Sequence, residues 1–193
     1  MASILIQNYK IAYKMKIILF FILSTLVISC ASHGSKKEVA IETNISVEIL
    51  TCPEKGTCTL ELMANKSITF KKDDFDIVYP VITDGEKTVL KYTYNKNTSP
   101  KYQDGHYTEI VYAEFDPVLQ NIKLENAELE PFKFHFGRLC FCKGQTGYYP
   151  IKRGNFTLVK KGSDSIQIDL DFEVKQVPQI VNRISEIISV KSN

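Results

Sequence analysis

The sequence predicts an all-β domain, a single antiparallel β-sandwich or barrel of about eight or more strands that ends in a short amphipathic helix. From Ile41 onward apolar residues tend to recur at every second position, which is the period of a strand with one buried face. Ten Tyr and eleven Phe favour strands as well, because aromatic side chains fit a pleated surface. With 193 residues, 44% hydrophobic and 24% charged, the chain suits one globular domain over residues 41–193.

The alternation is clearest over residues 166–174, where every even position is apolar and every odd position is polar. Phe132, Phe134 and Phe136 repeat the pattern in a second segment. A strand with one dry and one solvated face is typical of an antiparallel sheet that covers a core from one side. Turn-forming residues separate the strand-like segments, which are 45–49, 60–62, 67–71, 76–83, 87–95, 107–115, 121–129, 132–142, 148–159 and 165–175.

The last segment changes to a helical period. Pro178 suits the first turn of a helix. Four isoleucines then recur at i, i+4, i+7 and i+8, namely Ile180, Ile184, Ile187 and Ile188. We therefore expect an amphipathic helix over residues 178–189, packed against an open end or edge of the sheet or, alternatively, against a partner protein.

The net charge argues against nucleic acid as a partner. The formal charge is +2, but residues 1–29 contain Lys10, Lys14 and Lys16 and no acidic residue. Without this segment the chain has a net charge of −1. A near-neutral domain lacks the basic surface that binding to a phosphate backbone needs.

The N-terminal residues have the organisation of an export signal. Lys16 precedes a run over residues 17–28 that is apolar apart from one Ser and one Thr. As a helix this run would be about 18 Å long, which is too short for a bilayer core of about 30 Å but typical of a signal peptide. We therefore expect a signal peptide over residues 1–29, with Met15 as the true start.

The end of this run, Val27-Ile28-Ser29-Cys30, resembles the lipobox of bacterial lipoproteins, with an aliphatic residue at −3 and a small residue at −1. The resemblance implies cleavage before Cys30, acylation of its sulfur and attachment to a membrane through the acyl chains. Residues 30–40 would then be the lipidated cysteine and a flexible tether. The absence of Asp after the cysteine favours the outer membrane of the cell envelope. The alternative is an ordinary signal peptide with a coincidental cysteine.

Four cysteines remain, and an exported chain favours disulfides between Cys52, Cys58, Cys140 and Cys142. A Cys52–Cys58 bridge is close in sequence but needs a bulge to keep the apolar faces aligned. A Cys140–Cys142 bridge needs a local bend, because the Cα atoms would lie about 6.6–7 Å apart in an extended strand. Long-range pairs avoid both problems and are favoured by loop-closure entropy, about 4.5 against about 2.4 kcal/mol. The pairing stays open, as do a redox pair, a soft-metal thiolate site and free buried thiols.

The most distinctive segment is 137–150, Gly-Arg-Leu-Cys-Phe-Cys-Lys-Gly-Gln-Thr-Gly-Tyr-Tyr-Pro. It resembles segments of lipoproteins from Bacteroidota, a resemblance that implies no activity. Tyr148 and Tyr149 are the candidate contact surface, because their rings offer flat faces for stacking against a sugar or peptide. The alternative is a turn pinned by a disulfide, with its tyrosines packed at the margin of the domain.

We expect no catalytic residue, metal or cofactor. His33, His106 and His135 lie near no nucleophile motif, and we expect all three to be solvated. The run Asp73-Asp74-Phe75-Asp76 lacks the EF-hand pattern and predicts a turn. The sequence therefore favours a non-enzymatic envelope lipoprotein that binds or scaffolds another envelope component, with a glycan- or lipid-binding domain and a thiol-redox protein as alternatives.

Overall fold

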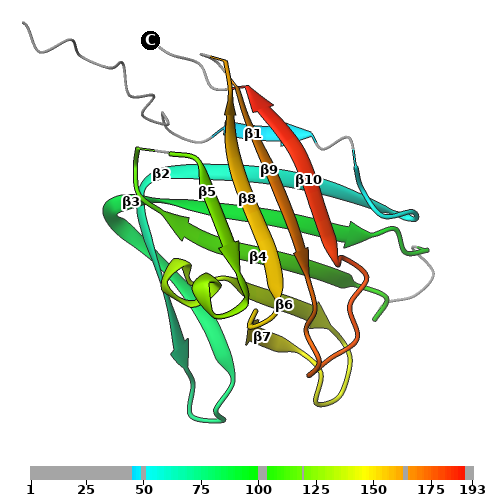
Figure 1. Cartoon of the computed structure of the whole chain (residues 1–193). Coiled ribbons are helices and arrows are strands. Elements are labelled where there is room, and N and C mark those ends of the chain that lie inside the picture. Colours follow the sequence, from blue (N-terminus) through cyan, green and yellow to red (C-terminus); the bar gives the residue numbers. More distant parts are fainter. Residues whose placement is uncertain (1–44, 49–50, 100–103, 119, 163–164, 190–193) are drawn as a thin grey trace, which may run out of the picture. The chain divides into compact units, whose positions relative to one another are not determined.

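The structure, a computed structural model, describes residues 45–48, 51–99, 104–118, 120–162 and 165–189. Two antiparallel sheets face each other as a sandwich (Figure 1), one of the two architectures that the alternating pattern predicts. The predicted signal peptide, Cys30 and the predicted tether lie outside the described residues. Within the part of the chain that the structure describes, no helix is long and apolar enough to cross a membrane.

The six-stranded sheet has the order β1-β2-β3-β4-β6-β7. Its strands are β1 Ile45–Glu48, β2 Gly56–Lys72, β3 Val78–Lys96, β4 Tyr107–Phe115, β6 His135–Cys140 and β7 Gly147–Pro150. The four-stranded sheet has the order β10-β9-β8-β5. Its strands are β5 Ile122–Glu125, β8 Gly154–Lys161, β9 Ser165–Phe172 and β10 Arg183–Ser189.

The space between the sheets is filled by the inward faces of the alternating strands. In β9 the even-numbered apolar residues are buried, as the sequence predicts. Phe156 of β8 reaches across to Phe115 of β4, and their stacked rings have centroids 5.3 Å apart. Because burying a large apolar side chain is worth about 1.5–3 kcal/mol, this continuous cluster is the main source of stability.

The C-terminal segment is a strand, so the prediction of a helix over residues 178–189 is wrong. β10 pairs with β9 along its whole length. Its inward positions are Ile184, Glu186 and Ile188, whereas Ile187 is 62% exposed. The buried glutamate and the exposed isoleucine hide the period of two, and the isoleucines therefore also fit a helical spacing. The unpaired edge of β9 supplies a ladder of backbone partners, and this tertiary context overrides the local pattern.

Three other strand predictions are only partly right. β5 ends at Glu125 and β6 begins at His135, so the predicted strands over 121–129 and 132–142 are both too long. The residues between them form a 3₁₀ helix, η2 (Asn126–Phe132), whose start is closed by a capping box. The predicted strand over 148–159 is in fact β7 and β8, which belong to different sheets.

β2 and β3 are longer than predicted, because four predicted segments join into two continuous strands. A bulge between Ala64 and Lys66 interrupts their pairing. Gly85 lies across this bulge, where a Cβ atom would come 2.2 Å from Ser67 Oγ, so glycine permits the close approach. The hairpin bends here and continues past the edge of the sheet (Figure 1). We call its distal part, residues 66–84, the arm.

Candidate binding surface

The arm packs against the outer face of the six-stranded sheet, opposite to the sandwich core. The backbone N–H of Ile68 donates to Glu114 Oε2 at 2.8 Å, and Lys133 Nζ donates to the Ile68 carbonyl at 2.9 Å. Lys133 Nζ also lies 2.7 Å from Glu114 Oε1. Apolar residues complete the contact in a second, smaller buried cluster of Ile68, Val89, Ile110 and Tyr112. The base of the arm is therefore fixed by hydrogen bonds, an ion pair and packing together.

An aromatic cluster extends this contact along the arm. Phe70 stacks on His135 of β6, with ring centroids 3.5 Å apart. Burial lowers the pKa of His135, although the Lys133 carbonyl, 2.9 Å from its Nδ1, opposes the shift. His135 is half-buried, so its prediction as a solvated residue is wrong. Its neutral form is favoured because a charged imidazole would be poorly hydrated under the Phe70 ring.

The tip of the arm, residues 73–77, is a preformed turn that exposes an aromatic ring. The Asp73 carboxylate accepts hydrogen bonds from the backbone N–H groups of Phe75 and Ile77, at 2.8 and 2.9 Å. Asp76 has a left-handed backbone, with φ 63°, and pairs with Lys72 at 3.1 Å. Phe75 is 84% exposed. The prediction of a turn is confirmed, and this turn holds Phe75 in solvent on a fixed backbone.

The loop between β6 and β7 presents a second exposed ring. β6 ends at Cys140, the chain bends at Phe141, and the Cys140–Cys142 disulfide joins residues whose Cα atoms lie 5.2 Å apart. This is the local bend that the sequence requires for such a bridge. Phe141, between the two cysteines, is 85% exposed. The short covalent ring restricts the loop to few backbone conformations.

A buried polar network supports this loop from inside the sandwich. Glu109 of β4 is fully buried and accepts hydrogen bonds from the backbone N–H groups of Ile180 and Val181, at 2.7 and 2.6 Å. The Tyr107 hydroxyl donates to Glu109 and accepts from Arg138 Nε at 3.2 Å. Burial, together with the bond to Glu109, raises the pKa of Tyr107 to about 12.

Arg138 links the buried network to the β6–β7 loop. It lies on β6, and its guanidinium donates to the Gln145 side chain in the β6–β7 loop. Its carbonyl accepts from Thr146 Oγ1 at 3.1 Å. The network therefore connects the β9–β10 loop, β4, β6 and the loop that carries Phe141. Each residue in the network makes at least one hydrogen bond within it. Buried polar groups that are satisfied in this way hold one another in a fixed arrangement.

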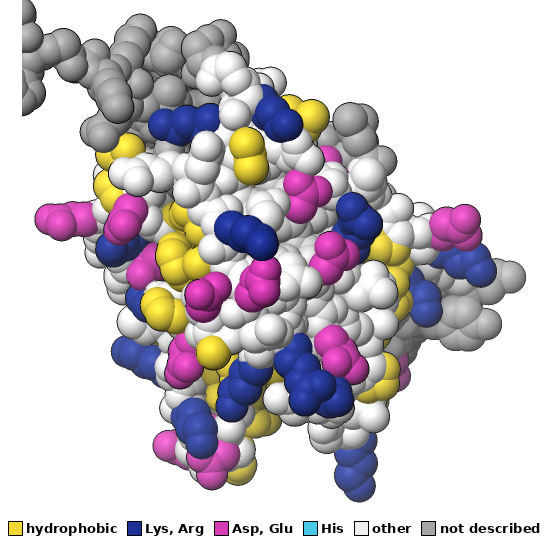
Figure 2. All heavy atoms as spheres, viewed as in Figure 1, with side chains coloured by type: hydrophobic (Ala, Val, Ile, Leu, Met, Phe, Trp, Pro, Cys, Tyr) yellow, Lys and Arg dark blue, Asp and Glu magenta, His cyan; other side chains and the backbone are white. Residues whose placement is uncertain are grey.

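The arm approaches the start of β7. A Cβ atom on Gly147, which follows the β6–β7 loop, would lie 3.9 Å from Ile77 Cγ2 of the arm tip. We define the docking surface as the exposed large apolar side chains of the two hairpins, namely Phe75, Ile77, Tyr79 and Phe141. Figure 2 shows hydrophobic, acidic and basic side chains side by side at its lower left, where Figure 1 places the arm tip. The front of that view, over β8 and β9, carries interspersed charges of both signs.

The other disulfide lies in the core and not at a tip. Cys52 and Cys58 are bonded, with Cα atoms 5.7 Å apart, and Cys58 is buried. The Tyr92 hydroxyl donates to Cys58 Sγ at 3.1 Å, and burial raises the Tyr92 pKa above its ordinary value. β1 pairs Val47 with Leu60, which aligns the apolar faces without placing the two cysteines opposite each other. Both bridges are thus local, and the long-range pairs that loop-closure entropy favours do not form.

The predicted contact tyrosines are half-buried on opposite faces of β7. Tyr148 lies over the backbone of β6, where a Cβ atom on Gly137 would come 2.4 Å from its ring. Tyr112 is its neighbour in the outer cluster, at 6.1 Å between centroids. Tyr149 packs against the sandwich core. His106 is exposed, as predicted, whereas His33 and Cys30 lie outside the described residues.

A surface groove of about 440 Å³ lies between η2 and the end of β7. Glu130, His135 and Lys152 are among the residues that line it. Over the described ranges, no group of three or more His, Cys, Asp or Glu side chains is arranged to hold a metal ion. All four described cysteines are in disulfides. A second groove of about 440 Å³ is lined by residues that include Asp116, Asn121 and Phe132, and both grooves could admit a small ligand.

The sequence interpretation missed the most exposed residues of the docking surface. At Phe75, the aspartates on both sides predict a solvated turn and say nothing about the exposure of the aromatic ring. Phe141 was hidden by the cysteines on each side. In both places the sequence does contain a feature that could have been used. An aromatic residue stands in a segment that cannot be a regular strand, because turn-forming residues or a disulfide bend the backbone. Glu109 offered no signal, since a glutamate within an alternating strand does not reveal which face it occupies.

Comparison of the chain with protein families, with curated proteins and with solved structures finds no match.

Proposed function

We propose that the chain is a membrane-anchored envelope lipoprotein, without enzymatic activity, that binds another envelope protein through the docking surface. The observation that carries this proposal is the pair of aromatic rings Phe75 and Phe141, which are 84% and 85% exposed on two constrained turns. Aromatic residues contribute a large share of the binding energy at interfaces. A ring on a backbone that is already fixed loses little conformational entropy when a partner covers it.

The anchor rests on the lipobox-like Val27-Ile28-Ser29-Cys30 at the end of an apolar run. Two or three acyl chains on one cysteine hold a protein stably at a lipid surface. The two disulfides agree with an oxidising compartment outside the cytoplasm. A binding role also agrees with the buried carboxylates Glu109 and Glu114, which are engaged by backbone N–H groups rather than aimed at a cleft.

The alternative of a glycan or lipid held between the sheets has less support. Large side chains such as Phe115, Phe156 and Phe172 occupy that space and pack into one cluster. A small ligand fits better in the groove beside η2, whose lining is mostly apolar but includes the polar side chains of Glu130 and Lys152, a mixture that suits an amphipathic molecule such as a glycan. For this second candidate, titration of the protein with envelope oligosaccharides should shift the NMR signals of Glu130 and Lys152, and Lys152→Ala should weaken the effect.

The test of the proposed function places a photoreactive phenylalanine analogue at position 75, 141 or 187 of the full-length chain in its own bacterium. Ile187 is the matched control, because it is 62% exposed but lies on β10 of the other sheet. We expect a discrete protein adduct from positions 75 and 141 and none from 187. Equal adducts from all three positions, or none from any, would overturn the docking surface.

The anchor is tested separately with Cys30→Ser. We expect this variant to lose incorporation of a labelled fatty acid and to leave the membrane fraction. If the parent chain takes up no acyl label and the variant fractionates as the parent does, the lipoprotein part of the proposal is refuted.

A further inference from the structure

We propose that the docking surface recognises an apolar pocket that is bordered by Lys or Arg beside the arm tip and by Asp or Glu beside the β6–β7 loop. This inference rests on the proposed function and specifies the chemistry of the partner protein. It follows from the charges beside the two exposed rings. Acidic side chains flank Phe75, whereas a basic side chain lies near Phe141.

The arm tip is acidic. Phe75 stands between Asp74 and Asp76, and residues 71–77 contain three aspartates against two lysines, Lys71 and Lys72. The Asp73 carboxylate caps the turn, and Asp76 pairs with Lys72. Asp74 is exposed. A partner that covers Phe75 must approach these carboxylates closely, and cationic side chains around its pocket would offset the loss of their hydration.

The β6–β7 loop is basic. Phe141 is followed after one residue by Lys143, which is exposed, and residues 141–146 contain no acidic residue. The two tips therefore present charges of opposite sign beside exposed apolar side chains. Such a pair of charges fixes the orientation of a partner, since the reversed orientation places like charges next to each other.

The acidic tip also argues against a lipid surface as the occupant. Apolar side chains that enter a bilayer interface are usually accompanied by Lys and Arg, which attract anionic head groups. The three carboxylates around Phe75 outnumber the two lysines beside them, Lys71 and Lys72, and this excess of negative charge would be repelled from such a surface. A protein with a basic rim is therefore the occupant that the arm tip fits.

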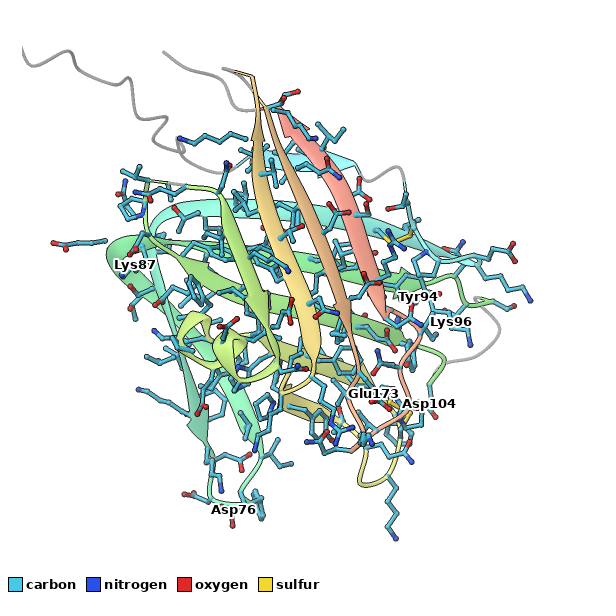
Figure 3. The ribbon with its side chains drawn as sticks, in the orientation of Figure 1. Asp76, Lys87, Tyr94, Lys96, Asp104 and Glu173 are labelled. Atoms are coloured by element: carbon cyan, nitrogen blue, oxygen red, sulfur yellow. A yellow bond between two sulfur atoms is a disulfide. The ribbon has the colours of Figure 1, made fainter. Side chains whose placement is uncertain are left out.

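The experiment measures the yield of the position-75 photoadduct in envelope membranes, in the full-length chain, as charges are changed. We expect Asp74→Lys and Lys143→Glu each to lower the yield about tenfold, and Asp74→Asn to lower it about threefold. Lys87→Glu is the control, because it makes the same charge change as Lys143→Glu at a site far from the Asp76 turn and from β6 and β7 (Figures 1 and 3); it should change the yield by less than about twofold.

The outcomes separate this inference from the proposed function. A protein adduct that is insensitive to Asp74→Lys and Lys143→Glu leaves the function standing and overturns the charge pattern of the partner. Reconstitution of the full-length chain in vesicles of phosphatidylethanolamine and phosphatidylglycerol supplies the second arm. No adduct between position 75 and lipid is expected there, and a lipid adduct would overturn a protein as the occupant.

Discussion

The sandwich core and the docking surface use the same side chain in opposite ways. Phe156 is 1% exposed and stacks on Phe115, whereas Phe141 is 85% exposed on a loop closed by a disulfide. In the core, apolar burial holds the backbone in place. At the tips, an aspartate cap and a disulfide hold the backbone, and the apolar side chain remains available. In the proposed function these exposed rings contact a partner, and we expect them to contribute little to folding.

The largest effect expected from this comparison is in the core. Phe156→Ala should lower the free energy of unfolding by about 3–5 kcal/mol, because it leaves a cavity against Phe115 and Phe134. The same substitution at Phe75 or Phe141 should change it by less than about 0.5 kcal/mol. Urea unfolding of the three variants measures both values. A loss above about 2 kcal/mol at either tip would show that the ring packs within the domain.

Breaking the buried network around Glu109 should cause the next largest loss in the free energy of unfolding. Glu109→Gln replaces a carboxylate that accepts three hydrogen bonds with an amide that carries its own donors, and should cost about 3 kcal/mol. Hydrogen exchange at the Ile180 and Val181 amides should speed up. Glu173→Gln, an exposed change in the same loop, is the control and should leave both unchanged. Unaltered exchange at Ile180 and Val181 in Glu109→Gln would contradict the role of the network.

The two disulfides should differ in what they stabilise. In the chain-entropy picture, removing Cys52–Cys58 by paired Ser substitution costs about 2.4 kcal/mol, and removing Cys140–Cys142 costs about 1.6 kcal/mol. The second pair of substitutions should also broaden the NMR signals of Phe141, whereas the first should leave them sharp. If Phe141 stays ordered without its disulfide, the loop is held by Arg138 and Gln145 alone.

The smallest effect should be the pH dependence at the base of the arm. Burial lowers the pKa of His135 in the folded chain, so the unfolded chain binds the proton first as the pH falls. The free energy of unfolding should therefore decrease as the pH drops through about 6.5, the ordinary histidine value. His135→Gln should remove this contribution. An identical pH profile in both proteins, followed by chemical denaturation, would contradict the burial of this ring.

Much of the fold follows from local pattern. β4 matches its predicted range and β9 matches its alternation, because in both strands the inward side chains are mostly apolar. β10 could not be predicted, since Glu186 points inward and Ile187 outward. The arm could not be predicted either. Its position depends on contacts between Ile68, Glu114 and Lys133, which are far apart in the sequence.

The candidate site was predictable only in part. The residue types predict the disulfide-forming cysteines and the acidic turn. The one-residue spacing of Cys140 and Cys142 also predicts that a bridge between them needs a bend in the chain. Exposure was not recognisable, because an aromatic residue in a turn is as compatible with packing as with solvent. Tyr148 and Tyr149 are half-buried, which agrees with the packed turn at the margin of the domain that the sequence also indicates; whether they contact a ligand stays a prediction.

The most direct test of the account compares binding of the full-length chain and its Phe75→Ala/Phe141→Ala variant to a detergent extract of the envelope from its own bacterium. Ile187→Ala is measured beside them as the control for loss of an exposed apolar side chain. The account predicts that the double variant loses at least about tenfold in saturable binding, with an unchanged free energy of unfolding, while the control binds as the parent does. Equal binding by all three proteins would contradict it.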